Sequence, residues 1–245
     1  FNTSARTLAF RQDNTTFEVS SSGDEIRFCT DHSLSRKFTR NWQDSQSLLR
    51  ENPKGLLLRM ASAGSKLVSP RVPVWLYSDS IASGPDNAYY QFIHDVALDD
   101  GVQRYYVVHN RQQRDALARE KYETSLVDFG SPKHWLLFPS AEKIITAFIE
   151  VENWSPMKAT ALNYVASPGA RELIYLQHGV LHAHMPWKYG AQRTAADRVV
   201  ISTPYEKALL TSVYAYESEQ LIEAGMPRYD FIEGKSASSD RILFA

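Results

Sequence analysis

The chain has 245 residues, of which 43% are hydrophobic and 22% are charged, and its formal net charge at pH 7 is -1. This composition supports a globular core and argues against a nucleic-acid partner bound through bulk positive charge. The single cysteine, Cys29, excludes an intrachain disulfide and fits a reducing, cytoplasmic compartment. The sequence also lacks a run of about 18 apolar residues, the length that spans a bilayer.

Two regions of different composition come first along the chain. Residues 1–40 contain short runs of strand-forming residues separated by turn residues, and we expect a small β-meander with strands at 7–10, 16–20 and 25–29. Residues 36–71 hold eight basic and two acidic residues, a net charge of +6. Apolar residues at helical spacing predict a helical pair there. Its basic face is either simply solvated or rests on anionic lipid.

From residue 73 onwards the pattern alternates between strands and helices. The alternation predicts right-handed βαβ crossovers and therefore an α/β fold with a Rossmann-like parallel sheet. The strands are expected at 74–77, 105–108, 125–129, 143–148, 173–176 and 198–201.

Helix starts in this region carry recognisable capping residues. Asp86 is the expected N-cap of a helix from Asn87 to about residue 98, and Ser131 caps a helix through residue 138. Thr203 and Glu206 form a predicted capping box, in which the glutamate side chain reaches back to the N–H of the cap. Two further helices are expected at 111–122 and 218–224.

The segment after strand 173–176 concentrates groups that can do chemistry. His178 leaves the end of a strand, where open α/β sheets bind ligands, and an imidazole that titrates near neutrality suits a general base. Gly179 would let a substrate approach closely. The competing interpretation of His178 is a core histidine bonded to backbone. Lys188 could hold a phosphate or could be ordinary solvated surface.

A metal site is not expected in this segment. His182 and His184 follow His178, but their spacing does not place all three on one helical face, and no nearby carboxylate or cysteine completes a ligand set. The sequence also has no glycine-rich phosphate loop. We therefore expect neither a metal nor another cofactor.

Three more positions have both a binding and a structural interpretation. Arg228 could bind phosphate, or it could clamp its own turn by pairing with Asp230. Asp86 and Asn87 read first as a helix cap and second as a contact to an acceptor substrate.

Several motifs then resemble one known family. The run YLQHGV at 175–180 resembles the strand-then-His-Gly signature of the CDP-glycerol glycerophosphotransferases, which make teichoic acids and related capsule polymers. Further resemblances follow in the family's order over residues 73–245, although Val180 and Leu181 stand where many members have Thr-Pro. They are WLYSDSIASGPDN at 75–87, VVISTPYE at 199–206, GMPRYD at 225–230 and ILFA at 242–245.

The resemblance implies a GT-B-like architecture of two Rossmann-type domains with the active site between them. It implies an acceptor-side domain at 73–232. The residue pattern alone, and not the resemblance, predicts a small β-rich segment at 1–45 and a basic helical segment at 46–72. Residues 233–245 would be a linker and the first strand of a nucleotide-binding domain that this chain lacks. The chain would then be inactive alone, and cytoplasmic or peripheral on the inner face of the membrane.

The implied reaction transfers a polyol phosphate from a CDP-linked donor to a hydroxyl of a polyol-phosphate polymer or lipid-linked acceptor, and releases CMP. His178 would be the general base. Six further residues would contact substrate: Gly179, Arg228, Asp230, Asp86, Asn87 and Lys188.

Two alternatives to this function stay open on the sequence. One is a GT-B glycosyltransferase that uses a nucleotide sugar. The other is a non-catalytic module that holds polymer or membrane while catalysis takes place elsewhere in the parent protein.

Overall fold

A computed structural model describes three strands within residues 8–29, seven helical positions between 42 and 56, and most of residues 72–231. Within that last range, residue 83 and the segments 119–121, 159–170 and 182–183 are not described. The predicted basic helical pair therefore lies outside the described residues except at those seven positions. The predicted linker and the strand at 242–244 lie outside them entirely.

The amino-terminal strands form a separate three-stranded antiparallel sheet. Strands β1 (Leu8–Gln12), β2 (Thr15–Ser22) and β3 (Glu25–Cys29) pair in the order β1-β2-β3. Each strand pairs with the next one along the chain, as expected when short turns join antiparallel neighbours. The predicted β-meander is confirmed.

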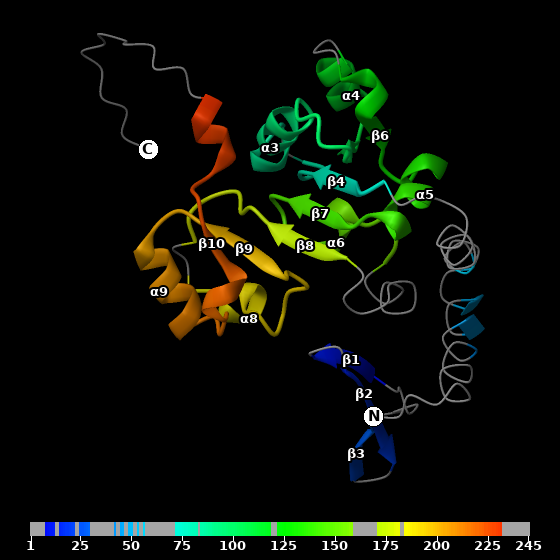
Figure 1. Cartoon of the computed structure of the whole chain (residues 1–245), viewed down its shortest axis with the longest axis vertical. Helices are drawn as coiled ribbons and strands as arrows, with labels where there is room; N and C mark the ends of the chain where they lie inside the picture. The colour runs from blue at the N-terminus through cyan, green and yellow to red at the C-terminus, as the bar shows by residue number, and fades with distance from the viewer. Residues whose placement is uncertain are drawn as a thin grey trace.

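The main sheet has seven strands in the order β10-β9-β8-β7-β4-β5-β6, and every neighbouring pair is parallel (Figure 1). The predicted α/β fold with a Rossmann-like parallel sheet is confirmed. The strands are β4 (Val74–Ser78), β5 (Gln103–Val108), β6 (Leu126–Asp128), β7 (Lys143–Thr146), β8 (Glu172–Tyr175), β9 (Arg198–Ile201) and β10 (Leu221–Glu223).

The strand order contains a topological switch between β4 and β7. From β4 the chain moves outward through β5 to β6, and it then returns to the other side of β4 and continues from β7 to β10. Open α/β sheets bind their ligands outside the carboxyl ends of the strands at such a switch. The loops after β4 and β7 therefore define where chemistry is expected.

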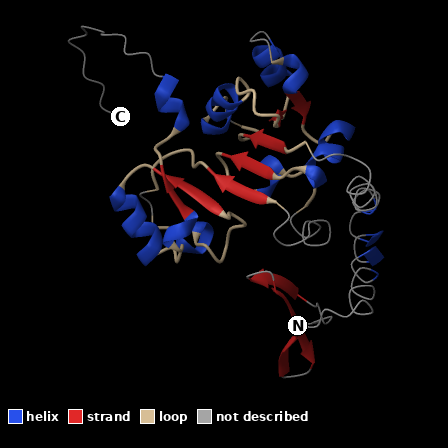
Figure 2. Cartoon of the chain, in the orientation of Figure 1, coloured by secondary structure: helices blue, strands red, loops and turns tan. Residues whose placement is uncertain are grey.

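Helices cover both faces of the sheet (Figure 2). Leu76 and Ile144 point to one face and share a core cluster with Phe138 and Leu210, while Tyr77 and Ile145 point to the other face. The helices are α3 (Asn87–Asp95), α4 (Arg111–Ala118), α5 (Pro132–Ser140), α6 (Val151–Trp154), α8 (Pro186–Tyr189) and α9 (Pro204–Ser212), with 3-10 turns η1 (Glu123–Ser125), η2 (Ser218–Gln220) and η3 (Pro227–Phe231).

The predicted helix caps are confirmed at all three starts. The Asp86 side chain accepts a hydrogen bond from the Asn87 N–H (2.8 Å), and Ser131 Oγ accepts one from the N–H three residues on (3.2 Å). Thr203 Oγ1 likewise accepts from the Glu206 N–H (3.1 Å). These bonds satisfy N–H groups that have no partner inside the helix.

The helix predicted at 218–224 is wrong. Residues Ser218–Gln220 form a 3-10 turn, and Leu221–Glu223 form strand β10, which pairs in parallel with β9. Without β10, strand β9 would be the edge of the sheet, with unpaired N–H and C=O groups. Pairing with these groups outweighs the helical propensity of residues 221–223. Helix α3 also ends at Asp95, three residues earlier than expected.

The buried His134 predicts a loss of stability in mild acid. Its ring is fully buried, and its Nδ1 accepts a hydrogen bond from the Gly130 N–H (3.1 Å). Burial, with a smaller contribution from nearby His109, lowers the pKa of His134 to about 4. Unfolded histidine titrates near pH 6.5, so the neutral ring gives its full contribution above that pH. This contribution, on the order of 3 kcal/mol, is lost as the pH falls from about 6.5 towards 4.

Urea unfolding of the chain at about pH 8 and pH 5 checks this prediction. We expect His134→Phe, which cannot gain a proton, to lose less free energy of unfolding between the two pH values than the wild type. His184→Phe changes an exposed histidine and should follow the wild type. Parallel pH dependences for the wild type and His134→Phe would contradict the prediction.

Candidate active site

Segments far apart in the sequence meet at the carboxyl-terminal edge of the main sheet. Asp79 follows β4, Phe148 lies two residues after β7, and His178 lies three residues after β8. Strands β4, β7 and β8 are parallel neighbours, so their carboxyl ends face the same side. Figure 1 shows this arrangement, with the arrowheads of these strands at one edge of the sheet.

Gln177 fixes the turn that presents His178. Its backbone is in the left-handed region, with φ of +61°, and its side chain is buried. The side-chain amide donates to the carbonyl of Val200 (2.7 Å) and to Glu206 Oε1 (2.8 Å). Its own carbonyl accepts a hydrogen bond from Asn87 Nδ2 (2.6 Å). Three hydrogen bonds thus hold a conformation that residues with a Cβ rarely adopt.

The residue that this turn presents is exposed. His178 stacks on the ring of Phe148, with centroids 4.6 Å apart and planes 8° apart, and the residue as a whole is accessible to solvent. The interpretation of His178 as a core histidine is therefore wrong, and its catalytic role stays a prediction. A Cβ added at Gly179 would meet no atom within 4 Å, so the backbone next to His178 borders open space.

Glu206 departs from the predicted capping box. Its carboxylate accepts from the N–H of Ser202 (2.8 Å), which precedes the cap, and not from the N–H of Thr203. It also accepts from the N–H of Leu181 (3.2 Å) and from the Gln177 amide. The carboxylate is buried between the loops after β8 and β9 and accepts hydrogen bonds from both, in place of the N–H of the cap. Glu206 thereby ties the His178 loop to α9.

Arg228, Asp86 and Asn87 form one hydrogen-bonded cluster. The Arg228 guanidinium lies 2.9 Å from Asp86 Oδ1, and the Arg228 N–H donates to Asn87 Oδ1 (3.2 Å). The predicted clamp between Arg228 and Asp230 is wrong, because the carboxylate that pairs with Arg228 belongs to Asp86. Asn87 is fully buried and joins η3 to the end of β8. Substrate contacts of these residues stay predictions.

Asp79 is a structural residue that the sequence reasoning missed. It is 1% exposed, and its carboxylate accepts from the N–H groups of Asp86 (2.9 Å), Ala88 (3.1 Å) and Tyr89 (3.1 Å) and from the Tyr106 hydroxyl (2.9 Å). Burial raises the pKa of Asp79 to about 6, against the effect of these hydrogen bonds. An aspartate directly after a buried strand, shortly before a capped helix, was the only signal.

Lys188 and Glu150 form an ion pair on the same edge. Lys188 Nζ lies 2.8 Å from Glu150 Oε1, and both side chains remain partly accessible to solvent. The hydrogen bond that Lys188 donates to Glu150 raises the pKa of Lys188. Burial opposes ionisation of Glu150, but Lys188 and, more weakly, His178 bring the pKa of Glu150 below its usual value. A cation, a carboxylate and an imidazole therefore lie within electrostatic reach of one another.

Of the two remaining histidines in this segment, the structure describes only His184. His184 is exposed and lies beside Trp187, with ring centroids 6.5 Å apart, while His182 lies outside the described residues. Among the residues that the structure describes, no group of three histidine, cysteine, aspartate or glutamate side chains could hold a metal ion. No helix within the described ranges has the length and apolar character needed to cross a membrane.

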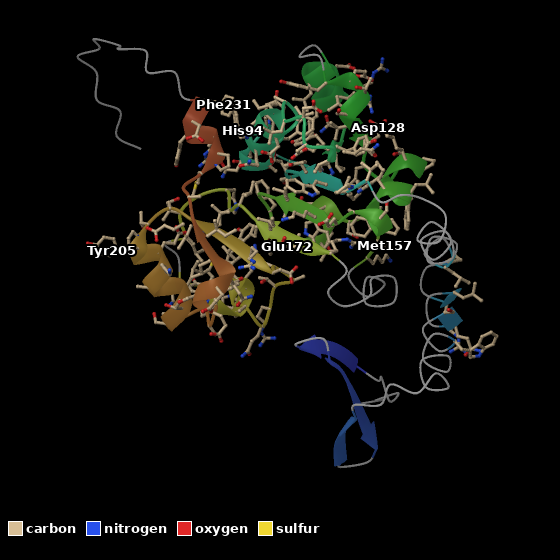
Figure 3. All side chains as sticks on the ribbon, in the orientation of Figure 1. His94, Asp128, Met157, Glu172, Tyr205 and Phe231 are labelled. Atoms are coloured by element: carbon tan, nitrogen blue, oxygen red, sulfur yellow. The ribbon has the colours of Figure 1, made fainter. Side chains whose placement is uncertain are left out.

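The opposite edge of the sheet carries ion pairs between strand starts. Glu172, labelled in Figure 3, lies 2.9 Å from Lys143 and 3.3 Å from Arg198, so it links β7, β8 and β9. A hollow at this edge is lined by Glu142, Arg171, Glu172, Asp197, Arg198, Glu219 and Gln220. Acidic side chains outnumber basic ones there, so it is poorly suited to a pyrophosphate, and we place the candidate site at the carboxyl edge.

Comparison with known proteins decides the family. The family model described as CDP-Glycerol:Poly(glycerophosphate) glycerophosphotransferase matches residues 65–243. The chain belongs to this family. The resemblance seen in the motifs is therefore confirmed, and the family name assigns its members to the transferases.

Relatives of this glycerophosphotransferase chain agree with that assignment. It is 25% identical over 218 residues to the minor teichoic acid biosynthesis protein GgaB of Bacillus subtilis (strain 168). The match covers 89% of the chain and 24% of GgaB. The chain therefore spans about a quarter of the length of this curated relative.

Solved structures of the wall teichoic acid polymerase TagF share the fold. One, of a variant soaked with CDPG, has a TM-score of 0.50 at 13% identity and covers 83% of this chain and 50% of TagF. Another TagF structure has a TM-score of 0.50 at 12% identity, with coverage of 80% and 47%. At such identities the likeness shows a common GT-B-like fold, of which this chain spans about half.

Proposed function

We propose that this chain is the acceptor-side domain of a transferase of teichoic-acid or capsule synthesis. The transferase moves a polyol phosphate from a CDP-linked donor, such as CDP-glycerol, to a hydroxyl of a polyol-phosphate polymer or lipid-linked acceptor. One observation carries the proposal: an exposed imidazole stands next to the switch point of the sheet in a chain of the glycerophosphotransferase family.

In the proposed reaction, His178 takes the proton of the acceptor hydroxyl. The oxygen forms a bond to the phosphorus that carries the polyol, and the bond from that phosphorus to the CMP oxygen breaks. The electron pair of the broken bond leaves with CMP. The imidazolium then releases its proton to solvent. A base of this kind contributes when its ring nitrogen can reach the hydroxyl, and an exposed ring beside Gly179 leaves room for that approach.

Positive charge near the transferred phosphate comes from Lys188 and Arg228 in this proposal. Each cation already has a carboxylate partner, Glu150 for Lys188 and Asp86 for Arg228. A phosphate must therefore share or displace these partners, and the more exposed Lys188 can exchange at lower cost. Asp230, which is exposed on η3, would line the acceptor side. Asn87 is buried and would contribute by holding the Gln177 carbonyl and the Arg228 backbone in place.

Residues 73–232 form the acceptor-side domain in this proposal, and a second Rossmann-type domain supplies the cytidine nucleotide site. Support comes from the family match together with the coverage of about half of TagF. The chain alone is then inactive, because it holds the base but not the donor. The enzyme would work on the cytoplasmic side of the membrane.

A release assay on the full-length parent protein tests the proposed donor. CDP-glycerol, CDP-ribitol and nucleotide sugars are supplied in turn with a polyol-phosphate acceptor, and CMP or nucleoside diphosphate is measured. We expect CMP from a CDP-polyol and none from the chain of 245 residues by itself. Release of nucleoside diphosphate from a sugar donor alone would favour a glycosyltransferase, and no release from any donor would favour a binding module.

An anionic membrane surface is a further proposed partner. The net charge of +6 over residues 36–71 supports it, since juxtaposed basic residues are attracted to anionic headgroups. Flotation of the chain with anionic vesicles at low and high salt tests the idea. Failure to float with anionic vesicles at low salt rejects it.

A further inference from the structure

Phe148 is the side chain that touches the proposed base. It lies two residues after β7, at the switch between β7 and β4, and comes from a different strand than His178. The two rings are nearly parallel, with planes 8° apart and centroids 4.6 Å apart. Such a stack covers one face of the imidazole and leaves both ring nitrogens, which lie in the ring plane, uncovered.

A closed backbone turn holds Phe148 in place. Its N–H donates to Thr146 Oγ1 (3.1 Å), and the Thr146 hydroxyl donates to the carbonyl of Phe148 (2.8 Å). Thr146 and Ala147 are fully buried, and the Phe148 ring packs against the core on the α3 side of the sheet. The phenyl ring is therefore anchored to the core of the sheet, whereas His178 belongs to the loop after β8.

Within the described part of the chain, no hydrogen bond orients the histidine ring. No described residue forms a hydrogen bond with either ring nitrogen of His178. Catalytic histidines are often oriented by a hydrogen bond to the second ring nitrogen, which selects the tautomer and fixes the ring. Here the phenyl ring is the group that can set the plane of the imidazole.

We propose that Phe148 is a positioning residue for His178 in the transfer reaction. The inference rests on the proposed function and adds to it. Phe148 holds the ring plane so that a nitrogen faces the acceptor hydroxyl. Its π face also attracts the positive charge that the imidazole gains as it takes the proton, an attraction that is weaker for the neutral ring. Phe148 therefore acts on the chemical step more than on substrate binding.

The stack itself is tested first, without any activity measurement. The chain is prepared with isotope-labelled histidine for NMR. The Cε1–H resonance of His178 should lie upfield of that of exposed His184, because the ring current of Phe148 shields it. The resonance is assigned by its loss in His178→Gln. We expect Phe148→Leu to move it to the position of an unstacked histidine and Phe148→Tyr to leave it shifted. An unmoved resonance in a folded Phe148→Leu overturns the proposal.

Kinetics of the full-length parent then test the role. We expect Phe148→Leu to lower kcat roughly tenfold with little change in the donor KM, and Phe148→Tyr to restore most of the rate. Phe129→Leu is a matched control, because Phe129 contacts another histidine, His109, at 4.7 Å. It should leave kcat and the His178 resonance unchanged.

The outcomes separate this inference from the function on which it rests. If Phe148→Leu moves the His178 resonance to the unstacked position but leaves kcat unchanged, the positioning role is overturned and His178 remains the base. Equal losses of kcat in Phe148→Leu and Phe148→Tyr also overturn it, since the tyrosine keeps the aromatic face. Full activity of a folded His178→Ala overturns the proposed function itself, and with it any role for its neighbour.

Discussion

Replacement of His178 by alanine should lower CMP release by the full-length parent protein about 10²- to 10⁴-fold. The acceptor hydroxyl must lose a proton as its oxygen bonds to phosphorus, and His178 is the exposed imidazole at the edge where the strands end. We expect the donor KM to change little, because the interaction that is lost is made in the transition state. Steady-state CMP release at several donor concentrations measures both quantities.

A matched variant distinguishes loss of the base from damage to the loop. His184→Ala removes another exposed histidine from the same loop and should keep nearly all of the activity. Since the His178 side chain is exposed, its removal should leave the free energy of unfolding within about 0.5 kcal/mol of the wild type. Retained turnover in a folded His178→Ala would falsify the assignment of this residue as the base.

Replacement of Asp79 by alanine should destabilise the domain by about 3–5 kcal/mol. The carboxylate is buried, and it is the acceptor for the N–H groups of Asp86 and Ala88 and for the Tyr106 hydroxyl. Alanine leaves these donors buried without a partner, and each such loss costs about 1–3 kcal/mol without being strictly additive. Equilibrium unfolding in urea, followed by circular dichroism, measures the change.

Two further variants show whether the number of acceptors is the cause. Asp79→Asn keeps one acceptor oxygen and should cost less than alanine, while Asp99→Asn changes an exposed aspartate and should be nearly neutral. A free energy of unfolding for Asp79→Ala within about 1 kcal/mol of the wild type would contradict this account. A smaller second effect on activity is expected, because Asp79 holds the start of α3, from which Asn87 reaches the His178 turn.

Local sequence patterns were sufficient for the first six strands of the main sheet and for the helix starts. Buried parallel strands are short apolar runs, so the strands predicted at 143–148 and 198–201 could be recognised between polar segments, although the first of them ends at residue 146. Helix caps depend on contacts within three residues, so Asp86, Ser131 and Thr203 could be found without knowledge of the fold. The family resemblance, which rested on motifs in order, was correct for the same reason.

Features that depend on distant partners could not be found in this way. Strand β10 forms because β9 has unpaired backbone groups at the edge of the sheet. The sequence of residues 221–223 does not indicate that they will pair with β9. The carboxylate of Glu206 serves loops up to 29 residues away, and Arg228 pairs with an aspartate 142 residues earlier. In both cases the nearest partner in sequence was predicted, and the partner nearest in space was different.

The proposed base was found from sequence, but the group beneath it was not. His178 carries a local signal, a histidine followed by glycine at a strand end. Phe148 looks like any apolar residue after a strand, and its significance appears only once β7 and β8 are placed side by side. An aromatic ring that supports another side chain leaves no trace in periodicity or charge.

The left-handed backbone of Gln177 limits which substitutions this position can accept. Glycine would relieve the left-handed torsion but would delete the amide that reaches strand β9 and helix α9. Asparagine would tolerate the torsion, yet it is one methylene too short for both partners. Neither glycine nor asparagine therefore replaces Gln177 without loss. An engineer who recombines or randomises this loop should hold position 177 constant and vary its surroundings.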